Sequence, residues 1–304
     1  MKTYEQIVKE RMIPKYPKEL LGGKFRGKAP QGETGYPHIF QNLKDNFIDG
    51  KYPDMKRLKG KLPNGKIHYN CATHLNSSQT MCISYFKKFF ENETYEPLLA
   101  EILMMSGIDV AGTEFVDAIF EYEPDSEEGT NFDFYLRLSD GRSISWEIKF
   151  TEKDFGGTTK KKGEERRYIT KWETIYTPML QKCVYHNDPD VDCDDYRCFM
   201  SGNLTDNCCA HDKCAIHEFY RYYQIRRNIA YAQQEGDYVL FLTPKENHSL
   251  DEGRAYIETY AGKYNTDHIR NMYWEDLLNI TLQVVSCDSN LLDYYTKFKC
   301  KYFE

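Results

Sequence analysis

The stretch that decides the fold is Asn131–Phe155, NFDFYLRLSDGRSISWEIKFTEKDF. Apolar and polar side chains alternate on both sides of Asp140-Gly141. Alternation with a period of two residues is typical of half-buried strands, and a short glycine-containing segment between two such runs favours a β-hairpin. We therefore predict two antiparallel strands joined by a tight turn.

The register of this hairpin follows from its apolar side chains. A two-residue loop at 140–141 would place Glu147 opposite Phe134 and so put a charge on the apolar face. A three-residue loop at 139–141, with Gly141 left-handed, pairs Phe134 with Trp146 and keeps the apolar face continuous, which is what fixes a register. We predict the three-residue loop, with Trp146 on the buried face.

This register brings two acidic side chains together. Asp133 lies directly opposite Glu147, and Lys149 follows on the same polar face, where its truncation would open no cavity. Facing carboxylates repel by roughly 0.2–1 kcal/mol when exposed, and a divalent cation between them reverses the sign. Carboxylates on a rigid sheet suit Mg²⁺, which keeps waters for a substrate phosphate. A lysine beside such a water can orient it and stabilise negative charge growing on phosphorus.

The same residues match a family pattern. Asp133, followed on the next strand by Glu147-Ile148-Lys149, resembles the D…(D/E)xK motif of the restriction-endonuclease-like nucleases, the PD-(D/E)xK superfamily. The stretches TNFDFYL, WEIKFTEKDFG, LNSSQ at 75–79 and YQIRRN at 223–228 are similar to a branch of bacterial proteins described as restriction endonucleases. The resemblance covers roughly residues 75–246. A surface strand with a solvated triplet is the alternative, but it explains neither the facing acids nor the matching flanks.

The resemblance implies a fold and an activity. The fold would be α/β, a mixed β-sheet flanked by helices, with the hairpin as its catalytic centre. The activity would be that of a restriction- or defence-type endonuclease that hydrolyses DNA phosphodiester bonds with Mg²⁺ or Mn²⁺. Asp133, Glu147 and the carbonyl of Ile148 would bind the metal, and Lys149 would position the attacking water.

Three further residues are auxiliary candidates. In this family a glutamate from the helix before the sheet often reaches the metal, which points to Glu101 in the helix expected between Thr94 and Gly107. Gln224 and Arg227, at i and i+3, share one helix face, and the resemblance implies that this face borders the active site. Solvent exposure or helix capping is the alternative for each of them, and for Asn228 we favour that alternative.

A basic segment follows the second strand of the hairpin. Its cations are the best candidates for contacts with nucleic-acid phosphates, although a solvated loop is the default. They are Lys160, Lys161, Lys162, Arg166 and Arg167.

A cysteine-rich insertion occupies residues 183–217. Thiolates suit a structural Zn²⁺ site, although the spacings are not those of common zinc knuckles, and free cysteines are the alternative. The candidate zinc ligands are Cys193, Cys198, Cys208, Cys209 and Cys214. Such a zinc would lie away from Asp133.

We expect three parts in the chain. Residues 1–74 form a partly irregular N-terminal arm with one helix near Ile39–Phe47. Residues 75–250 form the nuclease-like core, which includes the cysteine-rich insertion. Residues 251–304 form a C-terminal helical segment packed on the core, with an edge strand at Thr281–Ser286.

Composition narrows the remaining classes. With 47 acidic and 40 basic side chains the net charge is −7, which argues against a general nucleic-acid-coating protein but allows a nuclease with locally clustered cations. No apolar run approaches the ~18 residues of a membrane span, and the charged N-terminus lacks the apolar core of a signal peptide. We therefore expect a cytoplasmic protein with DNA as partner and no membrane contact.

Two other functions stay open at this point. One is a non-catalytic nucleic-acid-binding relative that uses the same sheet, against which the intact acids and lysine speak. The other is a zinc-binding interaction protein organised by the cysteine-rich insertion. The residues do not decide between a monomer and a homodimer.

Overall fold

A central six-stranded sheet organises the molecule. The computed structural model describes residues 2–53, 58–60, 69–156, 165–186 and 215–304. In spatial order the strands are β3 (Lys59–Gly60), β4 (Phe115–Tyr122), β5 (Phe132–Leu138), β6 (Ser143–Ile148), β7 (Tyr238–Thr243) and β8 (Ile269–Tyr273). Strand β5 pairs antiparallel with both β4 and β6, whereas the pairs β3–β4, β6–β7 and β7–β8 are parallel. The predicted mixed sheet flanked by helices is therefore confirmed.

The hairpin of β5 and β6 has the predicted register. Phe134 pairs with Trp146 and Leu136 with Ile144. The Leu138 amide donates to the carbonyl of Arg142 at 2.8 Å, which closes a three-residue loop. Gly141 in that loop has φ 95°, the left-handed conformation that the register requires.

A parallel connection leads from β6 to β7. Parallel neighbours need a crossover rather than a tight turn, and here the crossover is helical. It contains α5 (Glu165–Lys171), a π-helical turn (Trp172–Tyr176), α6 (Thr177–Leu180), α8 (Ala215–Arg221) and α9 (Tyr223–Ile229). The sequence predicts the return to a buried strand at 238–242, and β7 confirms it.

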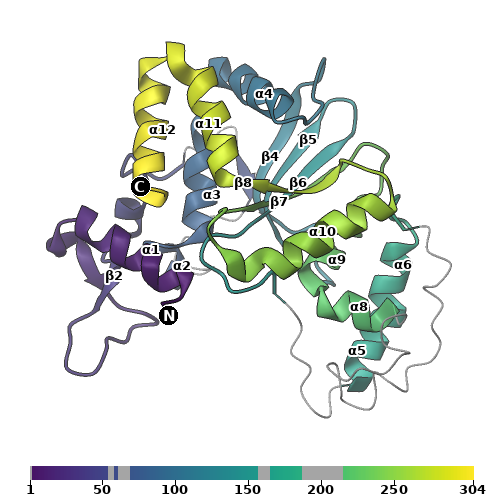
Figure 1. The fold of residues 1–304 in the computed structure, drawn as a ribbon, viewed down its shortest axis with the longest axis horizontal. Coiled ribbons are helices and arrows are strands. Elements are labelled where there is room, and N and C mark those ends of the chain that lie inside the picture. The colour runs from purple at the N-terminus through teal and green to yellow at the C-terminus, as the bar shows by residue number, and fades with distance from the viewer. Residues whose placement is uncertain (1, 54–57, 61–68, 157–164, 187–214) are drawn as a thin grey trace.

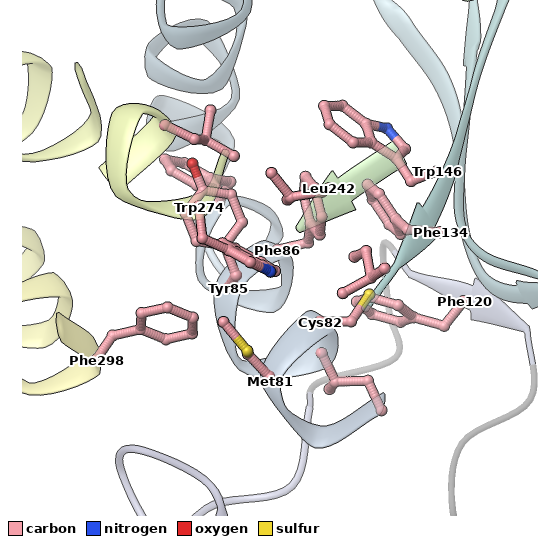
Figure 2. Close-up of a cluster of buried hydrophobic side chains, with 14 of the residues drawn as sticks. Met81, Cys82, Tyr85, Phe86, Phe120, Phe134, Trp146, Leu242, Trp274 and Phe298 are labelled. Carbon is pink, nitrogen blue, oxygen red and sulfur yellow. The ribbon is translucent and has the colours of Figure 1, made fainter. Parts of the chain in front are cut away.

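One face of the sheet packs on α3 (Ser78–Phe86) and α11 (Trp274–Val284), and α12 (Ser289–Tyr302) packs on these two helices (Figure 1). Phe86 stacks on Phe134 with ring centroids 4.1 Å apart, and Trp146 is fully buried beside them (Figure 2). Tyr85 continues the cluster toward Trp274. These aromatic contacts fix which face of the hairpin is apolar, and so which face is left for polar side chains.

The opposite face is covered by α9 and α10 (Asp251–Lys263). Ile225 and Ile229 of α9 and Ile257 of α10 pack against Val239 and Phe241 of β7. Burial on both faces explains why β7 is a continuous apolar run rather than an alternating one.

The N-terminal arm is an integral part of this core. Its elements are α1 (Tyr4–Met12), β1 (Leu21–Gly23), β2 (Tyr36–Phe40) and α2 (Tyr69–Ala72). Val8 and Met12 are fully buried, and the Arg11 guanidinium donates to the carbonyls of Tyr302 and Phe303 at the end of α12. The helix expected near Ile39–Phe47 is wrong, because β2 and a 3₁₀ turn (Leu43–Asn46) occupy that segment.

The C-terminal part is also more than helical. The expected edge strand at Thr281–Ser286 is wrong, because these residues continue α11 and the 3₁₀ turn Val285–Cys287. Thr281 is buried one turn after Leu277 and Leu278, so helical spacing outweighs the β-branched composition. The last strand is instead β8, between α10 and α11. Within the described ranges, no helix combines the length and apolar character needed to cross a membrane.

Candidate active site

The two acids of the hairpin lie together where β5 and β6 part. The regular pairing ends at Phe134 and Trp146. One residue further along, an Asp133 carboxylate oxygen accepts a hydrogen bond from the Ile148 amide at 2.6 Å. Asp133 therefore reaches β6 between Glu147 and Lys149, and the predicted cross-strand neighbours are confirmed.

Glu147 is held by three donors. Its Oε1 accepts from Lys149 Nζ at 2.8 Å and from Gln224 Nε2 at 2.6 Å, and its Oε2 accepts from Asn228 Nδ2 at 2.8 Å. Lys149 Nζ also donates to Gln224 Oε1 at 2.9 Å. Glu147 is 3% exposed and Lys149 is 8% exposed, so this ion pair is buried. Water does not screen these charges, so the hydrogen bonds are strong, and a network whose members are all paired is rigid.

The electrostatics of the acids favour a nearby cation. Removal from water raises the pKa of Asp133 well above its usual range, and the charges of Glu147 and Glu121 add to this, whereas Lys149 and the Ile148 amide oppose it. Burial alone would lower the pKa of Lys149, but the carboxylates of Glu147, Glu152 and Asp133 outweigh it and raise that pKa. Lys149 is therefore charged, and the acids around it still exceed it in number.

The donor set fits a hard divalent cation. Carboxylates of Asp133 and Glu147 with a backbone carbonyl are oxygen ligands of the kind that Mg²⁺ binds, with water in the other positions. Among the described residues, no group of three or more His, Cys, Asp or Glu side chains lies close enough together to hold a metal ion.

A cleft of about 390 Å³ opens beside Asp133. Its walls come from α1, α2, the start of α3, β4 and the segment after β6. The lining residues beside Asp133 are Glu5, Cys71, His74, Asn76, Ser77, Ser78, Gln79, Glu121, Thr151, Glu152 and Lys153. The stretch LNSSQ, singled out by resemblance alone, therefore lies against the acid. Ser77 caps α3 by accepting from the Thr80 amide at 3.2 Å, which fixes the start of that helix at the cleft.

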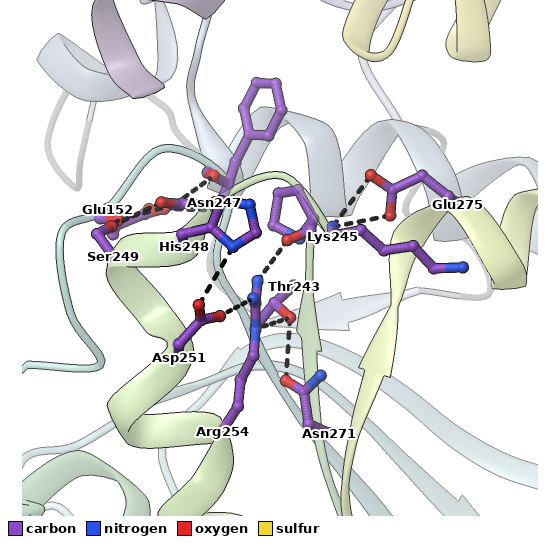
Figure 3. A network of polar contacts seen from close by, with 12 residues as sticks. Glu152, Thr243, Lys245, Asn247, His248, Ser249, Asp251, Arg254, Asn271 and Glu275 are labelled. Carbon is purple, nitrogen blue, oxygen red and sulfur yellow. Dashed lines mark hydrogen bonds and ion pairs between the residues drawn. The ribbon is translucent and has the colours of Figure 1, made fainter. Parts of the chain in front are cut away.

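The cleft wall after β6 is tied to the end of β7 (Figure 3). Buried Asn247 donates to the carbonyls of Phe150 at 3.1 Å and Glu152 at 2.9 Å, and Ser249 donates to the same Glu152 carbonyl at 3.2 Å. Arg254 of α10 in turn donates to Thr243, the last residue of β7. The position of the cleft-lining segment after β6 therefore depends on the end of β7 and the loop that follows it.

Helix α9 supplies the other wall of the acidic cluster. Gln224 contacts Glu147 and Lys149, as the resemblance implies. Arg227 lies over the Tyr223 ring at 5.1 Å, and its Nη2 is 3.4 Å from Asn228 Oδ1, so its described contacts are with α9 itself. The surface interpretation of Asn228 is wrong, because its side chain is fully buried on Glu147. The i, i+4 spacing of Gln224 and Asn228 is the signal that could have shown this.

A comparison with protein families matches nearly the whole chain. The model described as "Restriction Endonuclease associating with ARP" matches residues 22–303. The chain belongs to this family. Its match runs from β1 to α12 and includes the hairpin, α9 and every cleft-lining residue except Glu5. No curated protein and no solved structure matches the chain.

Glu101 does not line the cleft beside Asp133. Glu101 is exposed on α4 (Glu96–Met105), which packs on α11. The chain just after α4 contacts the start of β7, where the Asp109 amide donates to the Tyr238 hydroxyl at 3.0 Å, whereas Glu147 lies beside the end of β7. Glu121 lines the cleft instead. The sequence did not single it out, although the pairing of β4 with β5 places it opposite Asp133.

The remaining candidates are only partly described. Lys160, Lys161 and Lys162 lie outside the described residues, Arg166 falls in the first turn of α5, and Arg167 is exposed. The zinc candidates also lie outside them: Cys193, Cys198, Cys208, Cys209 and Cys214. Cys183, at the start of the insertion, is buried, and its thiol donates to the Ile229 carbonyl at 3.2 Å. Burial raises the pKa of Cys183 to about 11, as expected for a packed thiol.

Proposed function

We propose that this protein is a metal-dependent endonuclease of the PD-(D/E)xK type that hydrolyses phosphodiester bonds in DNA. The observation that carries the proposal is the buried Lys149–Glu147 pair on the strand next to Asp133, which itself lines the cleft. Membership of a restriction-endonuclease family supports DNA as the substrate. A buried lysine paired with the Glu147 carboxylate beside a second acid costs desolvation energy that a non-catalytic relative would not need to spend.

Each residue of the cluster has a defined part in this proposal. Asp133, Glu147 and the Ile148 carbonyl would hold Mg²⁺ or Mn²⁺, which when bound acts as a Lewis acid and lowers the pKa of a coordinated water. Lys149 donates to the attacking water and stabilises charge that develops on the phosphate. Gln224 and Asn228 orient Glu147, and Gln224 also fixes the Lys149 ammonium.

Binding of the DNA backbone would use cations outside this cluster. The candidates are Lys160, Lys161, Lys162, Arg166 and Arg167, which follow the cleft-lining residues 151–153 in the sequence. Each contact with a phosphate releases counterions and makes affinity fall with salt. Because the chain is acidic as a whole, such contacts have to be local.

A structural Zn²⁺ in the cysteine-rich insertion is a separate proposal. Thiolates of Cys193, Cys198, Cys208, Cys209 and Cys214 would supply a closed tetrahedral site. Elemental analysis of protein purified without chelator tests it, and protein that contains no zinc would contradict it.

The activity is tested with the intact protein on supercoiled plasmid, linear DNA and RNA. Each substrate is incubated with Mg²⁺, with Mn²⁺ and with EDTA. The proposal expects cleavage of DNA with either metal and none with EDTA. Metal-dependent cleavage of RNA alone would replace DNA as the substrate class, and cleavage that persists in EDTA would contradict the metal requirement.

A further inference from the structure

A tight turn directly after β1 presents an arginine to solvent. The Phe25 amide donates to the Lys28 carbonyl and the Lys28 amide to the Phe25 carbonyl, both at 2.9 Å, so Arg26 and Gly27 form a two-residue hairpin turn. Their φ values are 49° and 74°, the left-handed conformation that a type I′ turn requires at both central positions. Both residues are exposed.

Arginine is an unusual residue for the first of these positions. Asparagine, aspartate and glycine tolerate a positive φ, as Asn265 does at φ 48°, whereas arginine is strained there. The Arg26 guanidinium lies over the Phe25 ring at 5.2 Å, and within the described part of the chain it makes no side-chain hydrogen bond. A strained, exposed residue whose N–H donors are unused points to a function beyond closing the turn.

Two lysines flank this arginine. Lys24, Arg26 and Lys28 are all exposed, and among the residues that the structure describes no acid forms an ion pair with any of them. The exposed Lys297 on α12, by contrast, pairs with Asp293 of the same helix. In a chain of net charge −7, three unpaired cations on one turn form a local positive site for an anion.

The turn is anchored on the wall of the cleft beside Asp133. The Phe25 ring packs edge-on against the His74 ring with centroids 5.4 Å apart, and His74 lines the cleft. His38 of β2 also packs against His74, with centroids 5.4 Å apart. Burial lowers the pKa of both histidines to about 4, so they are neutral at neutral pH and anchor the turn without adding charge. An anion held by the turn would therefore lie beside the cleft.

We propose that residues 24–28 bind the phosphate backbone of a DNA duplex that enters the cleft. The planar guanidinium of Arg26 matches two oxygens of one phosphate, and the ammonium groups of Lys24 and Lys28 act as point charges toward neighbouring phosphates. Because the turn hydrogen bonds and the contact between Phe25 and His74 fix the backbone, little conformational freedom is lost on binding. The choice of DNA as the anion rests on the proposed function.

The test measures the affinity of the intact protein for a labelled DNA duplex by fluorescence anisotropy at several salt concentrations, with Ca²⁺ in place of Mg²⁺ or Mn²⁺. The wild type is compared with Arg26→Gly, Arg26→Lys and Lys297→Ala, the last removing an exposed cation of α12. Arg26→Gly should bind several-fold more weakly at low salt, and the slope of log affinity against log salt should be shallower by about 0.9. Arg26→Lys should keep the slope because it keeps the charge, and Lys297→Ala should bind like the wild type.

Thermal melting of the same variants separates binding from folding. Glycine is relaxed at φ 49°, so Arg26→Gly should melt at or above the wild-type temperature while it binds DNA less well. A purely structural role for Arg26 predicts the opposite, a lower melting temperature with unchanged binding. If Arg26→Gly does not fold, Arg26→Asn, which tolerates the same conformation, takes its place.

The outcomes separate this contact from the proposed function. Wild-type affinity and salt slope in folded Arg26→Gly would overturn the contact, even if the wild type cleaves DNA. Equal losses in Arg26→Gly and Lys297→Ala would also overturn it, because they would show a general effect of charge. Binding that depends on Arg26 in a protein that cleaves no DNA with Mg²⁺ or Mn²⁺ would support the contact and contradict the proposed hydrolysis.

Discussion

Lys149 is the residue whose surroundings differ most from those expected. The alternation of β6 places it on a polar face, where truncation should be harmless. The structure corrects this, because α9 covers that face and buries Lys149 on Glu147 and Gln224. The polar face of the hairpin is therefore buried at Lys149 and not exposed to solvent.

Lys149→Met should strongly destabilise the protein, in contrast to Lys297→Met. Breaking a buried ion pair costs about 3–5 kcal/mol, and the donors Gln224 and Asn228, which stay on Glu147, keep the loss at the lower end. Lys297 forms an i, i+4 ion pair with Asp293 in which both side chains are 62% exposed, and such pairs contribute about 0.3–0.5 kcal/mol. Urea unfolding of both variants makes the comparison, and equal losses would contradict the buried pair.

Asp133 should make the metal-free protein less stable as pH rises. Its pKa is raised in the folded state, so the native chain binds this proton more tightly than the unfolded chain, where the pKa is about 3.9. Its stabilising contribution is complete below the unfolded pKa and is lost as pH rises through the native one. Melting in EDTA should therefore show Asp133→Asn gaining on the wild type as pH increases. A gap that is constant or that shrinks would disagree.

For single residues, the sequence predicted the site positions whose partners lie nearby in the sequence or across the hairpin. Asp133 and Glu147 follow from one register, and Gln224 follows from the family stretch around it. Glu121 and Asn228 were missed because their roles depend on the long-range packing of β4 on β5 and of α9 on β6. Period-two alternation even suggests the wrong direction for Glu121, because its left-handed conformation interrupts the alternation.

Among the elements, the hairpin loop sets the register of the acids and can be tested by its glycine. Gly141→Ala should destabilise the protein by about 1 kcal/mol or more, because an L-residue is strained at φ 95° and the new Cβ would lie 3.3 Å from Gln234. Gly262→Ala in α10 meets no atom within 4 Å and should stabilise by about 0.5–1 kcal/mol. Thermal melting distinguishes the two, and a Gly141→Ala variant as stable as Gly262→Ala would argue against this loop.

Helices and strands whose apolar residues follow one clear period could be predicted from the sequence. Elements whose apolar and polar residues follow no single period could not. The alternation of 115–122 and the apolar run of 238–242 appear as β4 and β7, and helical spacing appears as α10 and α12. The strand β8 was missed because Ile269–Tyr273, IRNMY, is half-exposed and has a polar centre. It is a strand because parallel pairing with β7 satisfies its backbone.

For the whole molecule, the first residues belong to the same core as the central sheet. Met12→Ala should cost about 2–5 kcal/mol, as expected for a fully buried methionine. Ile7→Ala, on the same helix but 47% exposed, should change stability by less than about 0.5 kcal/mol. One cooperative transition that shifts for Met12→Ala and not for Ile7→Ala is the expected melting result. A separate early transition assigned to the arm would contradict an integrated core.

The central claim is hydrolysis of DNA by a metal held at Asp133, and the most direct measurement is plasmid cleavage by Asp133→Asn beside the wild type. Asparagine keeps the shape and an oxygen that can accept from the Ile148 amide, so the variant should remain folded. With Mg²⁺ or Mn²⁺ we predict that the wild type cleaves and that the variant is slower by on the order of 10²–10³ or more, while in EDTA it melts at or above the wild-type temperature. A folded Asp133→Asn protein that cleaves plasmid at the wild-type rate would contradict the account.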